Sequence, residues 1–414
     1  MSHLVQSTRA GAVYGLTLLG LIIVAHVMKL PAMLFGPRYA SATGRSLIHA
    51  YREQGWHAIA AFAVIQVGTM FTIQAAVTIV TAALVKGVIV DPIAAQLGVG
   101  SSIGVPWISV GVLALCAVPL ALGGYSLLDR VVKVLMVVMA VSTVAAAATQ
   151  LPTLLSAGLP IVPEFRAIDA AWIAFAVALV GWMPAPLDIS VWHSLWAVAK
   201  SGKNGRSATR RECDTDFLVG YALCVVLAAS FVVLGAALLH SPGIEPAAGG
   251  AAFASQLISL YTDALGAWAQ PVISVCAVAV MFSTTLTVLD AIPRTLAEVW
   301  SVSRPRAVPS GARPPATDAA RTPAYWITLL VLSGGALLII AAFSARMRTL
   351  VDIATTLSFI GTPVIAWLNH RAMLSASVPA GRRPGPVLRV WSLLGIAMWL
   401  AFAGVFLVFA LPFA

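Results

Sequence analysis

The chain has 414 residues, of which 60% are hydrophobic and only 10% charged, and its formal net charge is +10. Soluble domains carry about 25% charged residues, so this composition excludes an ordinary soluble protein and indicates a polytopic membrane protein. Apolar runs longer than about 18 residues, without alternation, favour an all-α protein and exclude an outer-membrane barrel. The positive charge fits loops that face anionic lipid, so we expect the lipid bilayer as a partner and no nucleic acid.

Hydropathy predicts a single transmembrane domain over residues 1–414 with about ten spanning helices. One segment, 168–199, carries two prolines and is expected to be broken. The ten predicted segments are 11–36, 57–85, 104–122, 126–149, 168–199, 216–239, 265–290, 323–343, 349–369 and 389–412.

The loop charges predict the orientation. The loops after segments one, three, five, seven and nine hold nineteen Lys and Arg residues, against five on the other side. Lys29 lies inside the first segment and counts for neither side. The positive-inside rule places the basic loops in the cytoplasm and both ends of this chain outside. The Pro- and Arg-rich stretch 302–323 is interpreted as a disordered cytoplasmic loop.

The broken segment, ALVGWMPAPLDISVWH at 178–193, holds the candidate substrate site. Two prolines remove backbone donors and leave carbonyls free around Val180 to Ala185. Met183 offers a thioether, a soft metal ligand, although methionine in a membrane helix is more often a packing residue. Asp188 is expected in the first turn of the second half-helix, either capping free amides or facing a cation. His193 either lines the pathway or packs as a hydrogen-bonded histidine.

Other polar side chains in the spanning segments are candidates for a pathway, with helix-to-helix hydrogen bonding as the simpler interpretation. No catalytic triad, P-loop, HExxH motif or pair of carboxylates is present, so we expect neither an enzyme nor a resident cofactor. Four scattered cysteines predict neither disulfides nor a metal cluster. The pathway candidates are Gln66, Gln74, Ser190, Thr284 and Thr355.

Several motifs resemble those of the NRAMP (natural resistance-associated macrophage protein) family of divalent-metal transporters. GAVYGLTLL at 11–19, FGPRY at 35–39 and TGRSL at 43–47 resemble that family's second helix and the loop after it. Met183 and Pro184 match the start of its sixth-helix motif Met-Pro-His-Asn. The resemblance covers nearly the whole chain. It implies a LeuT-type fold of two inverted five-helix repeats, with an unwound helix at the start of each.

The resemblance also implies which residues form the site, and it shows where this chain departs from the family's motifs. The family's metal site uses the sixth-helix Met and a carbonyl three residues earlier, which maps to Val180. In the family's first-helix motif, Asp-Pro-Gly-Asn, the Asn position corresponds to His3 of this chain. No residue of this chain corresponds to the Asp. The family's acidic third-helix residues for proton transfer map to positions such as Gln66. Only four helices precede the broken one where the family has five, so we expect a chain one short of eleven helices, with a further helix upstream.

The leading hypothesis is therefore a secondary transporter that moves a divalent metal cation, its substrate, across the inner membrane. Transport would proceed by alternating access around Met183–Asp188. The ion, the proton coupling, the direction and the oligomeric state stay open, and a monomer would suffice. One alternative is a LeuT-type carrier of an organic solute, which Trp182, Trp192 and Trp196 could stack against. Another is a membrane sensor on the same fold that transports nothing.

Overall fold

The predicted membrane architecture is confirmed. The structure, a computed structural model, shows a multi-pass all-helical protein, with nine helices long and apolar enough to span a membrane in the described ranges. The shorter apolar helix α8 completes the ten predicted segments. The described residues are 3–98, 103–122, 126–162, 168–204, 208–247, 249–304 and 322–409.

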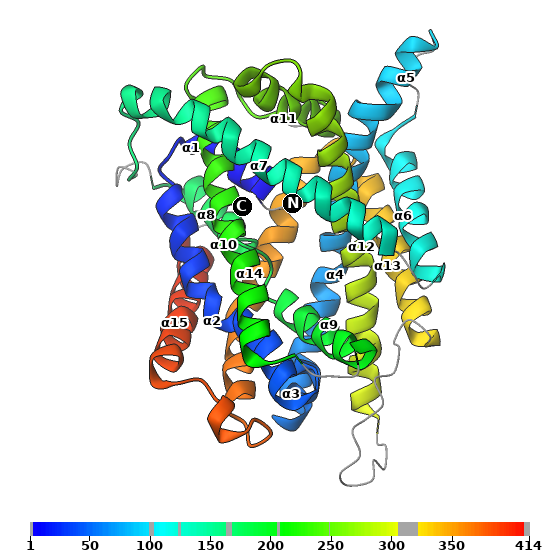
Figure 1. Ribbon diagram of the computed structural model, residues 1–414, viewed down its shortest axis with the longest axis vertical. Helices are drawn as coiled ribbons and strands as arrows, with labels where there is room; N and C mark the ends of the chain where they lie inside the picture. The colour runs from blue at the N-terminus through cyan, green and yellow to red at the C-terminus, as the bar shows by residue number, and fades with distance from the viewer. Residues whose placement is uncertain are drawn as a thin grey trace.

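The spanning helices form a bundle whose axes run mostly along the long direction of the molecule (Figure 1). α15 lies beside α2 at one edge and α13 lies at the opposite edge. These helices are α2 (Leu19–Thr43), α4 (Trp56–Val85), α6 (Val105–Leu122), α7 (Ser126–Ala157), α8 (Ala170–Gly181) followed by α9 (Ile189–Asn204), α10 (Arg210–Gly235), α12 (Ala269–Ser303), α13 (Pro323–Phe343), α14 (Met347–Leu374) and α15 (Pro386–Phe409).

Short helices occupy the two ends of the bundle. α11 lies across one end and α3 lies at the other (Figure 1). α11 was not predicted, because at 16 residues it is too short to span a bilayer. The short elements are η1 (His3–Ser7), α1 (Thr8–Tyr14), α3 (Leu47–Glu53), η2 (Lys86–Val90), α5 (Asp91–Gln96), η4 (Ala236–His240), α11 (Gly250–Leu265) and η6 (Ala380–Arg382).

The prediction of one continuous helix over 11–36 is wrong. The chain forms η1 and α1 first, turns at Gly15, and begins α2 only at Leu19. Gly15 has a φ of 59°, a left-handed conformation that glycine adopts without the steric cost of a Cβ. Hydropathy could not reveal the turn, because the residues on both sides of it are apolar.

Glycines let two helix pairs approach at backbone contact. A Cβ on Gly11 of α1 would lie 2.1 Å from the Val232 carbonyl oxygen, and one on Gly235 of α10 would lie 2.2 Å from that of Thr8. A Cβ on Gly36 of α2 would lie 2.0 Å from the Ser190 carbonyl oxygen. Small residues at such crossings are the usual means of tight packing between membrane helices. These contacts hold α1 against α10, and α2 against the second half of the broken helix.

The predicted loop at 302–323 is only partly described. α12 continues through Ser303, so the first two loop positions are helical. Residues 305–321 lie outside the described residues. Thr322 accepts a hydrogen bond from the Tyr325 amide and so caps the start of α13.

Candidate functional site

The break in segment five is present where the prolines predict it. α8 ends at Gly181 and α9 begins at Ile189, and the seven residues between them are not helical. Pro184 and Pro186 have no backbone N–H to continue the helical ladder. Carbonyl oxygens at the end of α8 therefore need other partners inside the protein.

The partner of those carbonyls is the ammonium group of Lys29 from α2. Its Nζ donates hydrogen bonds to the carbonyl oxygens of Val180 at 2.6 Å, Gly181 at 2.8 Å and Ala185 at 3.3 Å. The Lys29 side chain is fully buried. Nζ also lies 5.5 Å from the ring centroid of Trp399, within range of a cation–π interaction. The carbonyl oxygens at the break therefore form a cluster that binds a cation, and this cation is the ammonium group of the protein's own Lys29.

Asp188 lies at the end of the break, immediately before α9. Its side chain is buried, and it interacts electrostatically with Lys29. Neither carboxylate oxygen has a hydrogen-bond partner. The backbone amides of Asp188 itself and of Ile189, at the start of α9, lie near the carboxylate. The two alternatives, a carboxylate that caps the half-helix and one that faces a cation, therefore both stay predictions.

Met183 is fully buried and faces the first residues of the chain. Its Sδ accepts a hydrogen bond from the Ser7 hydroxyl of η1 at 3.7 Å. η1 and the broken helix are thus in direct contact, although 176 positions separate these two residues. The thioether and the carbonyl cluster belong to the same short stretch, so a ligand at the break could reach both.

A charged cluster on the η1 side joins α1 to α14. Arg9 donates two hydrogen bonds to the Asp352 carboxylate, at 2.7 and 3.0 Å. Gln6 donates to Asp352 at 3.2 Å and to the Thr355 hydroxyl at 3.4 Å, and it accepts from Arg9. α14 in turn contacts the break, because a Cβ on Gly181 would lie 2.3 Å from the Thr355 carbonyl oxygen. The predicted pathway residue Thr355 is therefore beside the site.

A second polar network lies at the start of α9. Asn369 of α14 donates to the Ser190 hydroxyl at 2.8 Å and to the Ala32 carbonyl oxygen at 2.9 Å. Its amide oxygen accepts a hydrogen bond from the Tyr51 hydroxyl of α3. The network joins α2, α3, α9 and α14, and it includes the predicted pathway residue Ser190.

The two candidate histidines lie away from the carbonyl cluster in the contacts that the structure describes. The His3 ring stacks on His26 of α2, with centroids 6.1 Å apart. The His193 ring lies edge-on to Phe217 of α10, with centroids 5.9 Å apart, and tilts against Trp196. Both were predicted as substrate ligands, and these ring contacts fit packing.

The remaining pathway candidates divide into two groups. Gln66 and Gln74 of α4 are fully buried, and both leave side-chain polar atoms without a hydrogen-bond partner. The Gln74 amide does donate to Thr78 at 3.0 Å. Thr284 bonds back to the Val280 carbonyl of its own helix, which is local helix bonding. The two glutamines therefore remain candidates for polar contact with water or solute.

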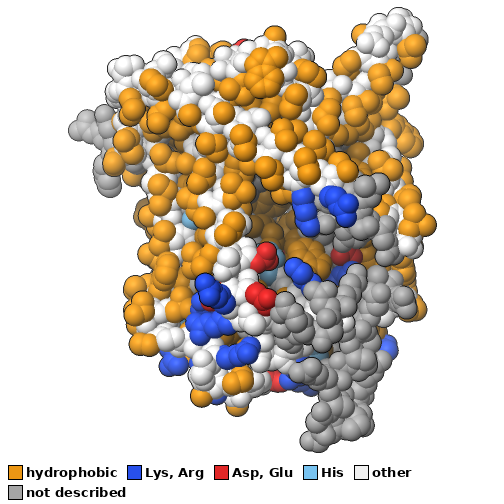
Figure 2. Space-filling model, viewed as in Figure 1, with side chains coloured by type: hydrophobic (Ala, Val, Ile, Leu, Met, Phe, Trp, Pro, Cys, Tyr) orange, Lys and Arg blue, Asp and Glu red, His pale blue; other side chains and the backbone are white. Residues whose placement is uncertain are grey.

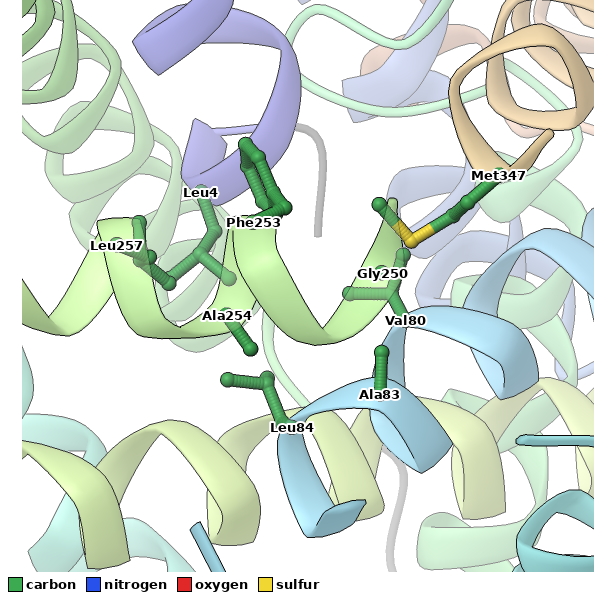
Figure 3. Close-up of a pocket in the computed structure, with 9 residues that line it drawn as sticks. All are labelled: Leu4, Val80, Ala83, Leu84, Gly250, Phe253, Ala254, Leu257 and Met347. Atoms are coloured by element: carbon green, nitrogen blue, oxygen red, sulfur yellow. The ribbon is translucent and has the colours of Figure 1, made fainter. Parts of the chain in front are cut away.

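A cavity among the described residues lies away from the break. It is a small apolar crevice near η1, between α4, α11 and α14 (Figure 3). No charged or polar side chain lines it, so it is unsuited to an ion. Nor do the described residues contain a cluster of three His, Cys, Asp or Glu side chains that could hold a metal. The crevice is lined by Leu4, Val80, Ala83, Leu84, Gly250, Phe253, Ala254, Leu257 and Met347.

Lys29 is a residue of the candidate site to which the sequence interpretation gave no role. An ionisable side chain inside a spanning segment is a site hypothesis by default, so its position alone was a usable signal. Its partners could not be derived, because they lie about 150 positions away. Ser7 and Asn369 were missed for the same reason, since each acts through a contact between distant segments.

Comparison with known proteins agrees with this architecture. A family profile described as natural resistance-associated macrophage protein-like matches residues 3–409. The chain belongs to this family. An uncharacterized protein of Pasteurella multocida (strain Pm70), PM0681, is 32% identical to this Nramp-like protein over 377 residues, which is 90% of this chain and 81% of that one. Family membership supports a membrane transporter of metal ions and not an enzyme.

Solved structures share the fold at low sequence identity. Structures of a manganese transporter of Eremococcus coleocola superpose with a TM-score of 0.64 at 15% identity, covering 97% of this chain and 82% of that one. The structure of MhsT in complex with L-phenylalanine superposes with a TM-score of 0.58 at 12% identity, covering 97% and 98%. The predicted LeuT-type fold of this Nramp-like protein is thereby confirmed.

Proposed function

We propose that this Nramp-like protein is a secondary transporter that moves a divalent metal cation across the inner membrane by alternating access around Met183–Asp188. The observation that carries the proposal is a broken, buried helix that presents carbonyls outside the regular helical ladder, a thioether and a carboxylate between Val180 and Asp188. Unwound backbone at membrane depth is the usual place for an ion site in transporters. The structurally similar protein of Eremococcus coleocola is a manganese transporter, which supports the same substrate class.

Three groups at the break are the proposed ligands. The Val180 carbonyl and the Asp188 carboxylate offer hard oxygen, and the Met183 thioether offers soft sulfur. Asp188 supplies the negative charge that a dication needs in a dry site. A mixed oxygen and thioether set favours a transition metal over magnesium or calcium.

Alternating access would open one side of this site at a time. On the η1 side, the Arg9–Asp352 ion pair joins α1 to α14, and the Gln6 bond to Asp352 joins η1 to α14. On the α9 side, Asn369 joins α2, α3 and α9 to α14. α14 carries both connections, so releasing one while keeping the other would expose the site to one compartment only.

The proposed orientation places the α3 end of the bundle in the cytoplasm. Lys and Arg side chains gather in the lower half of the visible face, where α3 lies, whereas the upper half of that face is largely hydrophobic (Figure 2). Basic loops remain on the cytoplasmic side of inner-membrane proteins. Cysteine labelling from outside, at single sites introduced into the η6 and α11 regions, would test this orientation: α11 should react and η6 should not.

Uptake into proteoliposomes tests the function. Purified protein should take up at least one of Mn²⁺, Fe²⁺, Zn²⁺ and Cd²⁺ above empty vesicles. Met183→Ala and Asp188→Asn should each lower that uptake at least tenfold, because each removes a proposed ligand. The matched controls are Met136→Ala and Asp263→Asn, at exposed positions on α7 and α11. Uptake untouched by both site variants would show that the site is elsewhere.

A carrier of an organic solute remains the second candidate, and Lys29 is the observation that favours it. A buried ammonium could receive a substrate carboxylate, as could the start of α9. The tryptophans proposed to stack on such a ligand are less available, since Trp182 is buried and bonded to Ser358. A thermal-shift screen of metals against amino acids separates the two functions. Ligand binding without flux would instead indicate a sensor.

A further inference from the structure

The carbonyl cluster at the break already has the features of a complete cation site. A lysine ammonium has three N–H donors, and here three carbonyl oxygens accept them. The Trp399 ring and the Asp188 carboxylate add a π face and a negative charge. In this arrangement all three donors of the ammonium are used, and the cluster already holds one cation.

The same atoms include the proposed metal ligands. Val180 supplies the shortest of the three hydrogen bonds to Lys29, and its carbonyl is also the metal ligand that the family resemblance implies. A metal ion on that carbonyl would meet the positively charged Nζ at contact distance. Two cations that close repel each other strongly in a site without water. Lys29 and a metal ion therefore cannot occupy the cluster together.

We propose that Lys29 is a built-in competitor for the substrate ion: its ammonium fills the carbonyl cluster in the empty transporter and must withdraw before a metal binds. The inference rests on the proposed function, because it concerns the same site. It predicts weak metal affinity in the native protein and a much higher affinity once the competing charge is removed.

The structure shows how α2 holds the competitor in place. The Tyr221 hydroxyl of α10 donates to the His26 carbonyl oxygen at 2.6 Å, one turn before Lys29. A Cβ on Gly395 of α15 would lie 2.5 Å from the Met28 carbonyl oxygen. Gly36 packs α2 onto α9 further along. Lys29 can therefore leave the cluster by rotation of its flexible side chain, or when α2 moves relative to α8.

The test compares Mn²⁺ binding by isothermal titration calorimetry for the native protein and Lys29→Leu, a neutral side chain with no metal ligand. Lys29→Leu should bind Mn²⁺ at least tenfold more tightly. The control is Lys200→Met, at an exposed position on α9, which should bind as the native protein does. Equal or weaker binding by Lys29→Leu, with measurable binding by the native protein, would overturn the proposal.

A second measurement separates this proposal from the function itself. Lys29→Ala leaves the cluster empty with room for a small amine, so n-propylammonium chloride should raise its melting temperature more than sodium chloride at equal concentration. The native protein should respond equally to both salts. Stabilisation of Lys29→Ala, with no Mn²⁺ binding by any variant, would support the cation cluster and overturn metal transport. If propylammonium does not stabilise Lys29→Ala, the carbonyl cluster is not the binding site of the Lys29 ammonium, and the proposal is overturned.

Discussion

Substitution of Gly36 by alanine tests the contact that positions the second half of the broken helix. The new Cβ would lie 2.0 Å from the Ser190 carbonyl oxygen, whereas ordinary contact begins at 3.4 Å. α2 and α9 must therefore separate by more than 1 Å. Asn369 bridges the two helices through Ala32 and Ser190, so both of its hydrogen bonds would lengthen.

The expected cost follows from those contacts. Overpacking costs about 1–3 kcal/mol, and each weakened buried hydrogen bond costs about 1 kcal/mol more. Alanine returns about 1 kcal/mol as the better helix former. Gly36→Ala should therefore lose about 2–4 kcal/mol in net stability, seen as a melting temperature lowered by several degrees in detergent.

Gly20→Ala is the matched control for that experiment. It lies on the same helix with nothing within 4 Å of its Cβ, so it should keep or raise the melting temperature. If Gly36→Ala proves as stable as Gly20→Ala, the close packing of α2 on α9 is refuted.

Three further substitutions probe other parts of the molecule. Met183→Leu should lower Cd²⁺ uptake more than Mn²⁺ uptake in proteoliposomes, because the lost thioether selects soft cations. Equal losses for the two ions would show that the Met183 sulfur is not a ligand. Asp290→Ala should cost about 1–3 kcal/mol by thermal unfolding, because it removes a buried acceptor of hydrogen bonds from Arg294; an unchanged melting temperature would contradict this. Arg9→Gln removes the ion pair between α1 and α14. A Ser7→Cys thiol in a cysteine-free background should then react faster with an external reagent. An unchanged rate would mean that the ion pair does not limit access to the site from that side.

The elements that local chemistry dictates could be predicted from the sequence. Hydropathy located the ten spanning segments, and Pro184 and Pro186 located the break, because proline acts on its own backbone whatever surrounds it. The first segment was misread where apolar residues continue through the turn at Gly15. α11 was missed because a helix that lies across the end of a bundle need not be long enough to span the membrane.

The candidate site could be predicted only in part, since its chemistry depends on contacts between distant segments. The free carbonyls around Val180 followed from the prolines, but Lys29 as their partner did not. Asp188 lies at the end of the break, where the prolines predict the start of the second half-helix, with the amides of Asp188 and Ile189 near its carboxylate. A pattern of residues specifies which groups are available, whereas the packing of α2 against α8 decides which of them meet.

The most direct test of the central claim is to locate a bound ion. Crystals of the protein, or of Lys29→Leu if the native protein binds too weakly, would be soaked in Mn²⁺ or Cd²⁺ and measured by anomalous scattering. Metal binding at the break predicts a peak within bonding distance of the Met183 sulfur and the Val180 carbonyl oxygen. A peak elsewhere in the protein, with none at the break, would contradict it.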